Sequence, residues 1–213
     1  MTRIRLLVFL LNLNFDHMPL FKIISTSSLA LALSFIIRFC LTITIAKLLS
    51  PNDMGIYSWV VTAFGILSLF VIFGQDNFLL RKIPEYKNKS TILLKQVLGF
   101  SVKHILSNFL ILFLLIYTIV SFTFSTWPTE YSSGLIILCL ALPMCAFTLI
   151  NSVILRVNEK PILAQIPESL LQPATLLLFI LISYFFSEYN INAEYFIYLN
   201  LLSWVLVIIF SLY

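Results

Sequence analysis

The chain alternates long apolar runs with short polar segments along almost its whole length. Each run is long enough to cross a membrane, because a helix rising 1.5 Å per residue needs about 20 residues to span a ~30 Å hydrocarbon core. The polar segments between them, such as "SPNDMG" at 50–55, contain residues that end helices and form turns. The pattern predicts an all-α integral membrane bundle of six transmembrane helices. These helices are expected at about 26–49, 55–75, 97–121, 134–155, 169–186 and 193–213.

The composition favours a membrane protein and argues against a soluble enzyme. Of the 213 residues, 61% are hydrophobic and 10% are charged, whereas a soluble domain has about 25% charged residues. Cys40, Cys139 and Cys145 lie in apolar runs at spacings that fit neither a zinc site nor a disulfide framework, so we expect them to be packing residues. The sequence has no Gly-rich phosphate loop or other familiar catalytic motif. We therefore predict no enzymatic activity, cofactor or metal.

Basic residues gather on one side of the predicted bundle. The N-terminal tail and the second and fourth loops hold ten Lys and Arg, whereas the opposite side has Lys47, at a helix end. The ten are Arg3, Arg5, Lys22, Arg81, Lys82, Lys87, Lys89, Lys95, Arg156 and Lys160. Because cytoplasmic loops of membrane proteins carry the excess of Lys and Arg, we expect both termini in the cytoplasm. This bias also accounts for the net charge of +4 without a nucleic-acid partner.

Two regions outside the predicted spans carry their own expectations. Residues 76–96 mix apolar and basic positions, so we expect them to lie partly in the inner membrane interface or to form an ordinary cytoplasmic loop. Residues 1–22 are expected to be a cytoplasmic tail, and an alternative start at Met18 would make residues 1–17 dispensable. Residues 23–213 are expected to form the six-helix transmembrane lobe. Because the chain stops inside an apolar run, we expect it to be truncated at its C-terminus.

Polar residues recur at helical spacing inside three of the predicted spans. Each set falls on one helix face, which would be costly against lipid and would line a shared polar cavity if turned inward. The alternative for the uncharged members is hydrogen bonding to neighbouring helices, which is common in membrane bundles. The candidates for lining the cavity are Ser34, Thr42, His104, Asn108 and Gln172, the last beside Pro173, which can loosen the backbone.

Two basic residues within these spans, Arg38 and Lys103, are the candidate substrate-binding residues of a cationic cavity. Arg38 falls ~15 Å from either edge of a ~30 Å core, where an arginine costs about 2.5–3.5 kcal/mol on insertion scales. The main alternative is a structural ion pair, but no acidic residue lies deep in a predicted span. Lys103 is expected about 10 Å inside, where snorkelling would also account for it. Because a guanidinium suits phosphate or pyrophosphate, the expected ligand is anionic.

Three stretches of the sequence resemble a family of membrane transporters. They are "AKLLSPNDMGIYSWVV" at 46–61, "FGQDNFLLRKIPEY" at 73–86 and "LRVNEKPILAQIPESLLQP" at 155–173. Together they are similar to oligosaccharide flippases of the Wzx type, within the MATE-like exporter superfamily. The matching positions at the first turn are Leu48, Leu49, Pro51, Gly55 and Tyr57, while Ser50 replaces the usual Gly and Met54 the usual Phe. The resemblance covers about residues 24–190, which correspond to the N-terminal half of such proteins.

The resemblance implies a transport function. Members of the family have two six-helix lobes and move undecaprenyl-pyrophosphate-linked oligosaccharides across the bacterial inner membrane by alternating access, for O-antigen or capsule assembly. Their central cavity is cationic, which suits Arg38. The chain would be one lobe, and its partners would be a lipid-linked anionic oligosaccharide, membrane lipids and a second lobe or second copy that completes the transporter.

Other functions stay open on the sequence alone. A drug or cation antiporter of the same superfamily would need a membrane-buried carboxylate, which the predicted spans lack at depth. A membrane glycosyltransferase or polymerase would need larger loops than the sequence offers. A structural membrane subunit without transport activity would bury Arg38 against another protein.

Overall fold

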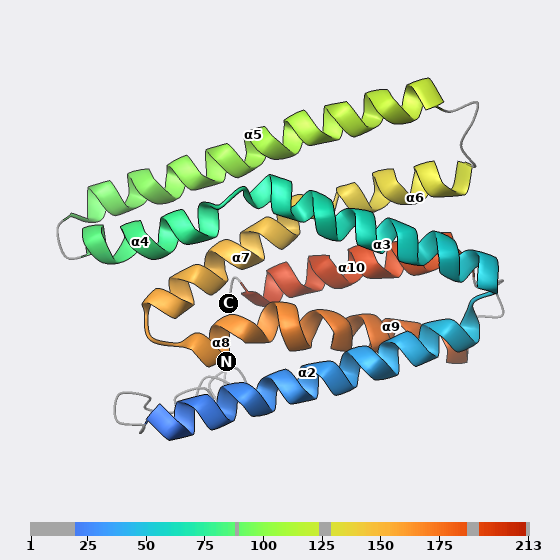
Figure 1. The fold of residues 1–213 in the computed structure, drawn as a ribbon, viewed down its shortest axis with the longest axis horizontal. Helices are drawn as coiled ribbons and strands as arrows, with labels where there is room; N and C mark the ends of the chain where they lie inside the picture. Colours follow the sequence, from blue (N-terminus) through green and yellow to red (C-terminus); the bar gives the residue numbers. More distant parts are fainter. Residues whose placement is uncertain (1–19, 88–89, 124–128, 187–191, 212–213) are drawn as a thin grey trace.

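The computed structural model describes residues 20–87, 90–123, 129–186 and 192–211 (Figure 1). Within these ranges every regular element is a helix, so the all-α prediction is confirmed. The elements are α2 (Leu20–Leu48), α3 (Pro51–Ile72), α4 (Gln75–Lys87), α5 (Thr91–Thr123), α6 (Thr129–Cys139), α7 (Leu142–Val157), α8 (Pro161–Ile166), the π-helix η2 (Pro167–Leu171), α9 (Gln172–Phe186) and α10 (Ala193–Ser211). The alternative start at Met18 lies outside the described residues.

The described ranges contain six helical segments that are long and apolar enough to cross a membrane. All six overlap the predicted spans, and the chain is a multi-pass membrane protein. The segments are Ser28–Leu48, Pro51–Lys87, Thr91–Phe122, Glu130–Val157, Pro161–Phe185 and Ala193–Ser211.

Of the region at 76–96, the described residues are largely helical, and its place at the membrane interface stays a prediction. α3 breaks at Phe73 and Gly74, whose φ angles are 40° and 77°, and the chain continues as α4, which runs beside the first part of α5 (Figure 1). α5 has 33 residues, about 50 Å, and so exceeds a ~30 Å core by about 20 Å.

Proline interrupts two of the other spans. α7 begins at Leu142 with Pro143 in its first turn, and Pro143 has no N–H to donate to the carbonyl of Cys139, where α6 ends. The fifth span changes from α8 to η2 at Pro167, and α9 then carries Pro173 as its second residue. These interruptions free backbone carbonyl groups inside the membrane-spanning part of the bundle.

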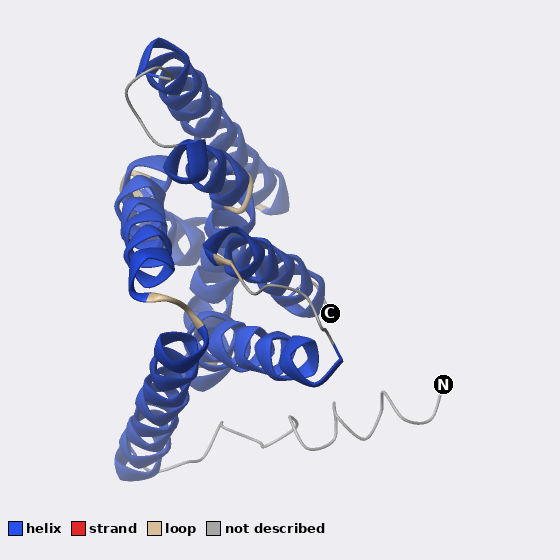
Figure 2. Ribbon diagram, turned by 90° about the vertical axis from the view of Figure 1, so that its right-hand side faces the viewer, coloured by secondary structure: helices blue, strands red, loops and turns tan. Residues whose placement is uncertain are grey.

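The packed centre of the bundle is α10, which contacts α3, α6, α7 and α9. Gly134 on α6 allows the closest approach, since a Cβ there would lie 2.7 Å from Ile197 Cδ1 and 3.2 Å from Val60 Cγ2. α2 is peripheral, and most of its described side chains are exposed. Figures 1 and 2 both place α2 and α5 on opposite sides of the bundle.

Candidate functional site

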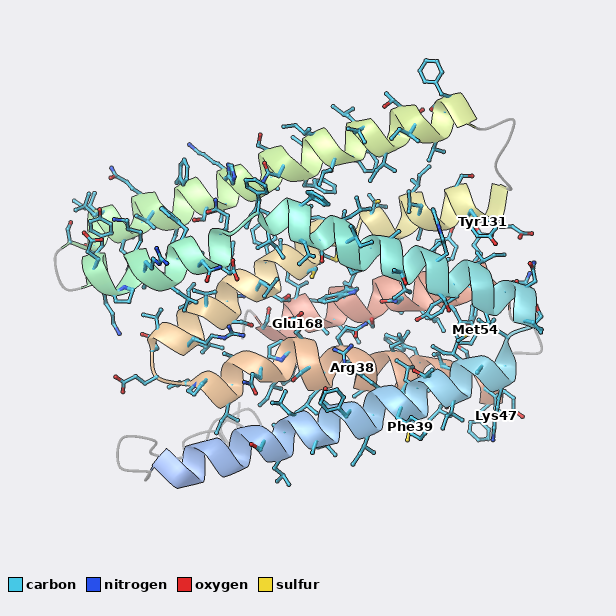
Figure 3. All side chains as sticks on the ribbon, in the orientation of Figure 1. Arg38, Phe39, Lys47, Met54, Tyr131 and Glu168 are labelled. Atoms are coloured by element: carbon cyan, nitrogen blue, oxygen red, sulfur yellow. The ribbon has the colours of Figure 1, made fainter. Side chains whose placement is uncertain are left out.

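Arg38 lies on α2 with an exposed side chain that reaches the fifth span. Its Nη2 donates a hydrogen bond to the backbone carbonyl of Glu168 in η2, at 3.2 Å. Figure 3 shows Arg38 between α2 and α9, close to Glu168. Long side chains on a helix lean toward its N-terminus, which directs Arg38 back along α2 to this carbonyl. Arg38 is ten residues from Leu48, the end of α2, and so about 15 Å from that end of the bundle.

The guanidinium of Arg38 has no ion pair with a carboxylate in the part of the chain that the structure describes. The salt bridge found there joins Lys82 and Glu85 on α4. Glu168 contacts Arg38 through its backbone oxygen. The charge of Arg38 is therefore hydrogen-bonded but not neutralised.

Ser34, one turn before Arg38 on α2, makes a parallel contact with η2. It is buried, with 5% of its surface exposed, and its Oγ donates to the carbonyl of Ser169 at 2.7 Å. Thr42, one turn after Arg38, instead donates to the Arg38 carbonyl within its own helix, at 2.9 Å. Of the three polar residues on this face of α2, Ser34 and Arg38 thus bind the fifth span, and Thr42 makes a hydrogen bond within α2.

The sequence of the fifth span explains why the carbonyls of Glu168 and Ser169 lack the backbone donors of an α-helix and can accept from side chains of α2. In an α-helix the Glu168 carbonyl would accept from the N–H of Gln172, but in η2 that N–H donates to the Pro167 carbonyl, five residues back. The Ser169 carbonyl would accept from residue 173, which is a proline and has no N–H. Ser34 and Arg38 supply the donors that Gln172 and Pro173 do not.

The polar residues of α5 have other partners. Asn108 Nδ2 donates to the Val71 carbonyl in the last turn of α3, at 3.3 Å. The His104 ring stacks on Phe100, with ring centroids 6.0 Å apart. Both residues are half-buried. The Asn108 hydrogen bond joins α5 to α3, as interhelical hydrogen bonds in membrane bundles do, whereas the His104 contact lies within α5.

Lys103 lies level with the junction between α3 and α4. Asn108 on one side of it contacts Val71 in α3, and Phe100 on the other side lies 6.0 Å from Phe78 in α4. α3 alone has 22 residues, about 33 Å, which fills the hydrocarbon core. The expected depth of about 10 Å inside the core stays a prediction. Lys103 is exposed, and snorkelling to the membrane surface would account for it.

Arg38 and Lys103 belong to separate parts of the bundle. Arg38 is on α2 and Lys103 on α5, and these helices lie on opposite sides of it (Figures 1 and 2). The described helices of the single chain therefore do not bring the polar face of α2 and the polar face of α5 into one cavity. The candidate site consists of Arg38, Ser34 and the two free carbonyls of η2.

Gln172 is buried in the bundle, at the start of α9, in a polar network with α10. Its Nε2 donates hydrogen bonds to Asn200 Oδ1 at 3.2 Å and to Ser203 Oγ at 3.4 Å. This network ties α9 to α10, so the structure gives Gln172 an interhelical role.

Some residues of these networks were missed in the sequence. Asn200 and Ser203 lie three residues apart in the last apolar run, a helical spacing that would have indicated a shared face. The carbonyls of Glu168 and Ser169 are backbone groups that no residue type in the sequence marks. The sequence feature that comes nearest to indicating them is Pro173, which cannot donate a backbone hydrogen bond.

No group of three His, Cys, Asp or Glu that could hold a metal occurs among the residues placed by the structure. Cys139 and Cys145 are buried without a disulfide, and Cys40 is exposed on α2. A small pocket lined by Ile72, Asp76 and Ile105, among others, has room for about one water molecule. It lies near the α3–α4 junction, away from Arg38.

Comparisons with known proteins add no assignment. No family model, no curated protein and no solved structure matches this chain.

Proposed function

We propose that this chain is one lobe of a flippase that moves an undecaprenyl-pyrophosphate-linked oligosaccharide across the bacterial inner membrane, for O-antigen or capsule assembly. The observation that carries the proposal is Arg38, an exposed guanidinium about 15 Å inside the bundle that no described carboxylate neutralises. A charge at this depth is costly against hydrocarbon and calls for water or an anionic group. A pyrophosphate group meets that need and matches the forked donors of arginine.

The surface around Arg38 suits a ligand that is part ionic and part lipid. Phe35 and Phe39, which flank Arg38 on α2, are 71% and 68% exposed. In the proposed mechanism the pyrophosphate contacts Arg38 while the polyprenyl chain stays in the bilayer beside such apolar side chains. Alternating access would then require a second lobe or a second copy facing α2.

The distribution of charge supports the proposed direction of transport. The basic side chains of α4, the start of α5 and the end of α7 lie at one end of the bundle. Lys47 lies at the other end, which also holds Met54 and Tyr131 (Figure 3). The basic end is the cytoplasmic end under the positive-inside rule. Arg38, whose side chain leans toward that end, would meet the substrate arriving from the cytoplasmic leaflet.

The test is Arg38→Ala in the intact gene, with surface polysaccharide as the readout. We expect surface polysaccharide to be lost and lipid-linked oligosaccharide to accumulate, with Arg38→Lys intermediate because it keeps the charge but not the fork. Lys47→Ala is the matched control, since it removes a cation from the end of the same helix. Normal surface polysaccharide in Arg38→Ala at normal expression would exclude Arg38 from transport.

A cation-coupled exporter of the same superfamily is the second candidate. The observation that favours it is Glu168, which is half-buried within the fifth span. For such an exporter, Glu168→Gln should abolish drug efflux driven by a proton or sodium gradient. For the flippase, the same variant should leave surface polysaccharide intact, because Arg38 contacts only the backbone oxygen of Glu168.

A further inference from the structure

The free carbonyls of η2 retain capacity to bind a ligand. A carbonyl oxygen has two lone pairs and can accept two hydrogen bonds. The Glu168 oxygen accepts from Arg38 Nη2 at 3.2 Å, and the Ser169 oxygen accepts from Ser34 Oγ at 2.7 Å. Because the Gln172 N–H donates to Pro167 and residue 173 is a proline, neither oxygen has the backbone donor that an α-helix would give it.

Donors and acceptors therefore lie side by side at this point of the bundle. The Arg38 guanidinium carries five N–H donors in a planar fork, and its described hydrogen bond uses one of its nitrogens. A ligand on the α2 side thus meets a cation and, one hydrogen-bond length away, backbone acceptors.

We propose that Arg38 and the carbonyls of Glu168 and Ser169 form a composite site for a phosphate ester whose neighbouring carbon atoms carry hydroxyl groups. The guanidinium binds the phosphate, and the carbonyls accept hydrogen bonds from hydroxyls of the adjoining sugar. This inference rests on the proposed function and assigns part of its specificity to the backbone of the fifth span. The site distinguishes a glycosyl phosphate from a phosphate that lacks hydroxyl donors.

The first experiment compares two ligands on the unaltered full chain in phosphatidylcholine nanodiscs. Glucose 1-phosphate and cyclohexyl phosphate have the same ring size and charge, but only the first has ring hydroxyls. We expect glucose 1-phosphate to bind about tenfold more tightly, the effect of one net hydrogen bond. Equal affinity would overturn the composite site while leaving Arg38 as an anion site. Absence of binding by both ligands would count against the proposed function as well.

The second experiment tests the carbonyls through Pro173→Ala, which supplies an N–H to the Ser169 carbonyl. We expect this variant to bind cyclohexyl phosphate as the unaltered chain does and to lose the preference for glucose 1-phosphate. Pro143→Ala, at the α6–α7 break, is the matched proline control and should keep the preference. Arg38→Ala should lose both ligands. A preference unchanged by Pro173→Ala would overturn the role of the carbonyls. If a variant fails to fold, the first experiment still tests the site, because it compares two ligands on the unaltered chain.

A third arm distinguishes a sugar phosphate from a lipid headgroup, because phosphatidylglycerol also carries hydroxyls next to a phosphate. Nanodiscs containing phosphatidylglycerol should leave the affinity for glucose 1-phosphate within about twofold. Displacement of glucose 1-phosphate by that lipid would assign the site to bulk headgroups and contradict the sugar assignment.

Discussion

Removing the Ser34 hydroxyl gives a direct test of the contact between α2 and the fifth span. Ser34 is 5% exposed and donates to the Ser169 carbonyl at 2.7 Å, and residue 173, the usual donor, is proline. Ser34→Ala would leave that carbonyl unsatisfied inside the bundle. Such a loss costs about 1–3 kcal/mol in soluble proteins, and interhelical hydrogen bonds in membranes average ~0.6 kcal/mol with a maximum of ~1.7. We expect a loss of about 1–2 kcal/mol in the free energy of unfolding.

The measurement is reversible unfolding in mixed micelles with rising dodecyl sulfate, followed by the fluorescence of the three tryptophans, Trp59, Trp127 and Trp204. Thr42→Val is the matched control, because Thr42 bonds to the Arg38 carbonyl of its own helix, at 2.9 Å. This control should change the free energy of unfolding by less than about 0.5 kcal/mol.

A double-mutant cycle with Pro173→Ala decides whether the explanation is correct. The Pro173→Ala substitution supplies the N–H that the Ser169 carbonyl lacks, so in that background Ser34→Ala should cost close to nothing. The expected coupling between positions 34 and 173 is about 1 kcal/mol or more. If Ser34→Ala costs the same in both backgrounds, the carbonyl is not what Ser34 stabilises, and the reasoning about the π-helix fails.

Two further predictions concern the packed centre. Gly134→Val should destabilise the bundle by about 1–3 kcal/mol, because Ile197 Cδ1 lies 2.7 Å from the first added carbon. Gly65→Val should be nearly neutral in the same unfolding assay, because no atom lies within 4 Å of a carbon added there. Equal effects of the two substitutions would contradict the close approach at Gly134. Asn200→Leu should cost about 1–2 kcal/mol, because Gln172 Nε2 loses its 3.2 Å acceptor in a buried site; an unchanged midpoint of unfolding would show that the network contributes no stability.

The span pattern was predictable because membrane-crossing helices need a minimum apolar length, and each predicted run overlaps one of the six helical segments that could cross a membrane. The depth of Lys103 stays a prediction, because hydropathy does not mark where a helix leaves the hydrocarbon. α5 starts at Thr91 and continues past the α3–α4 junction without a break. The contact of Asn108 with Val71 and the end of α3 place Lys103 level with that junction.

Helical spacing predicted which residues share a face, but not which neighbour that face meets. Ser34, Arg38 and Thr42 lie along one side of α2 as expected, yet their partners belong to residues 38, 168 and 169 and are backbone oxygens. A backbone oxygen carries no sequence signal of its own, since every residue has one. The proline that frees it does carry a signal, so Pro173 was a correct indication of a loosened backbone at this level of the fifth span.

The environment of Arg38 determines whether this residue is structural or functional. A structural arginine within a membrane bundle has its charge paired and its donors filled by the protein. Arg38 is exposed, donates to one backbone oxygen and has no ion pair among the residues that the structure describes. One neutral carbonyl does not offset the transfer of a full charge from water. The face of α2 that carries Arg38 must therefore meet water, an anionic ligand or another protein surface, and a ligand that brings both a phosphate and hydroxyl groups would satisfy the cation and the η2 carbonyls together.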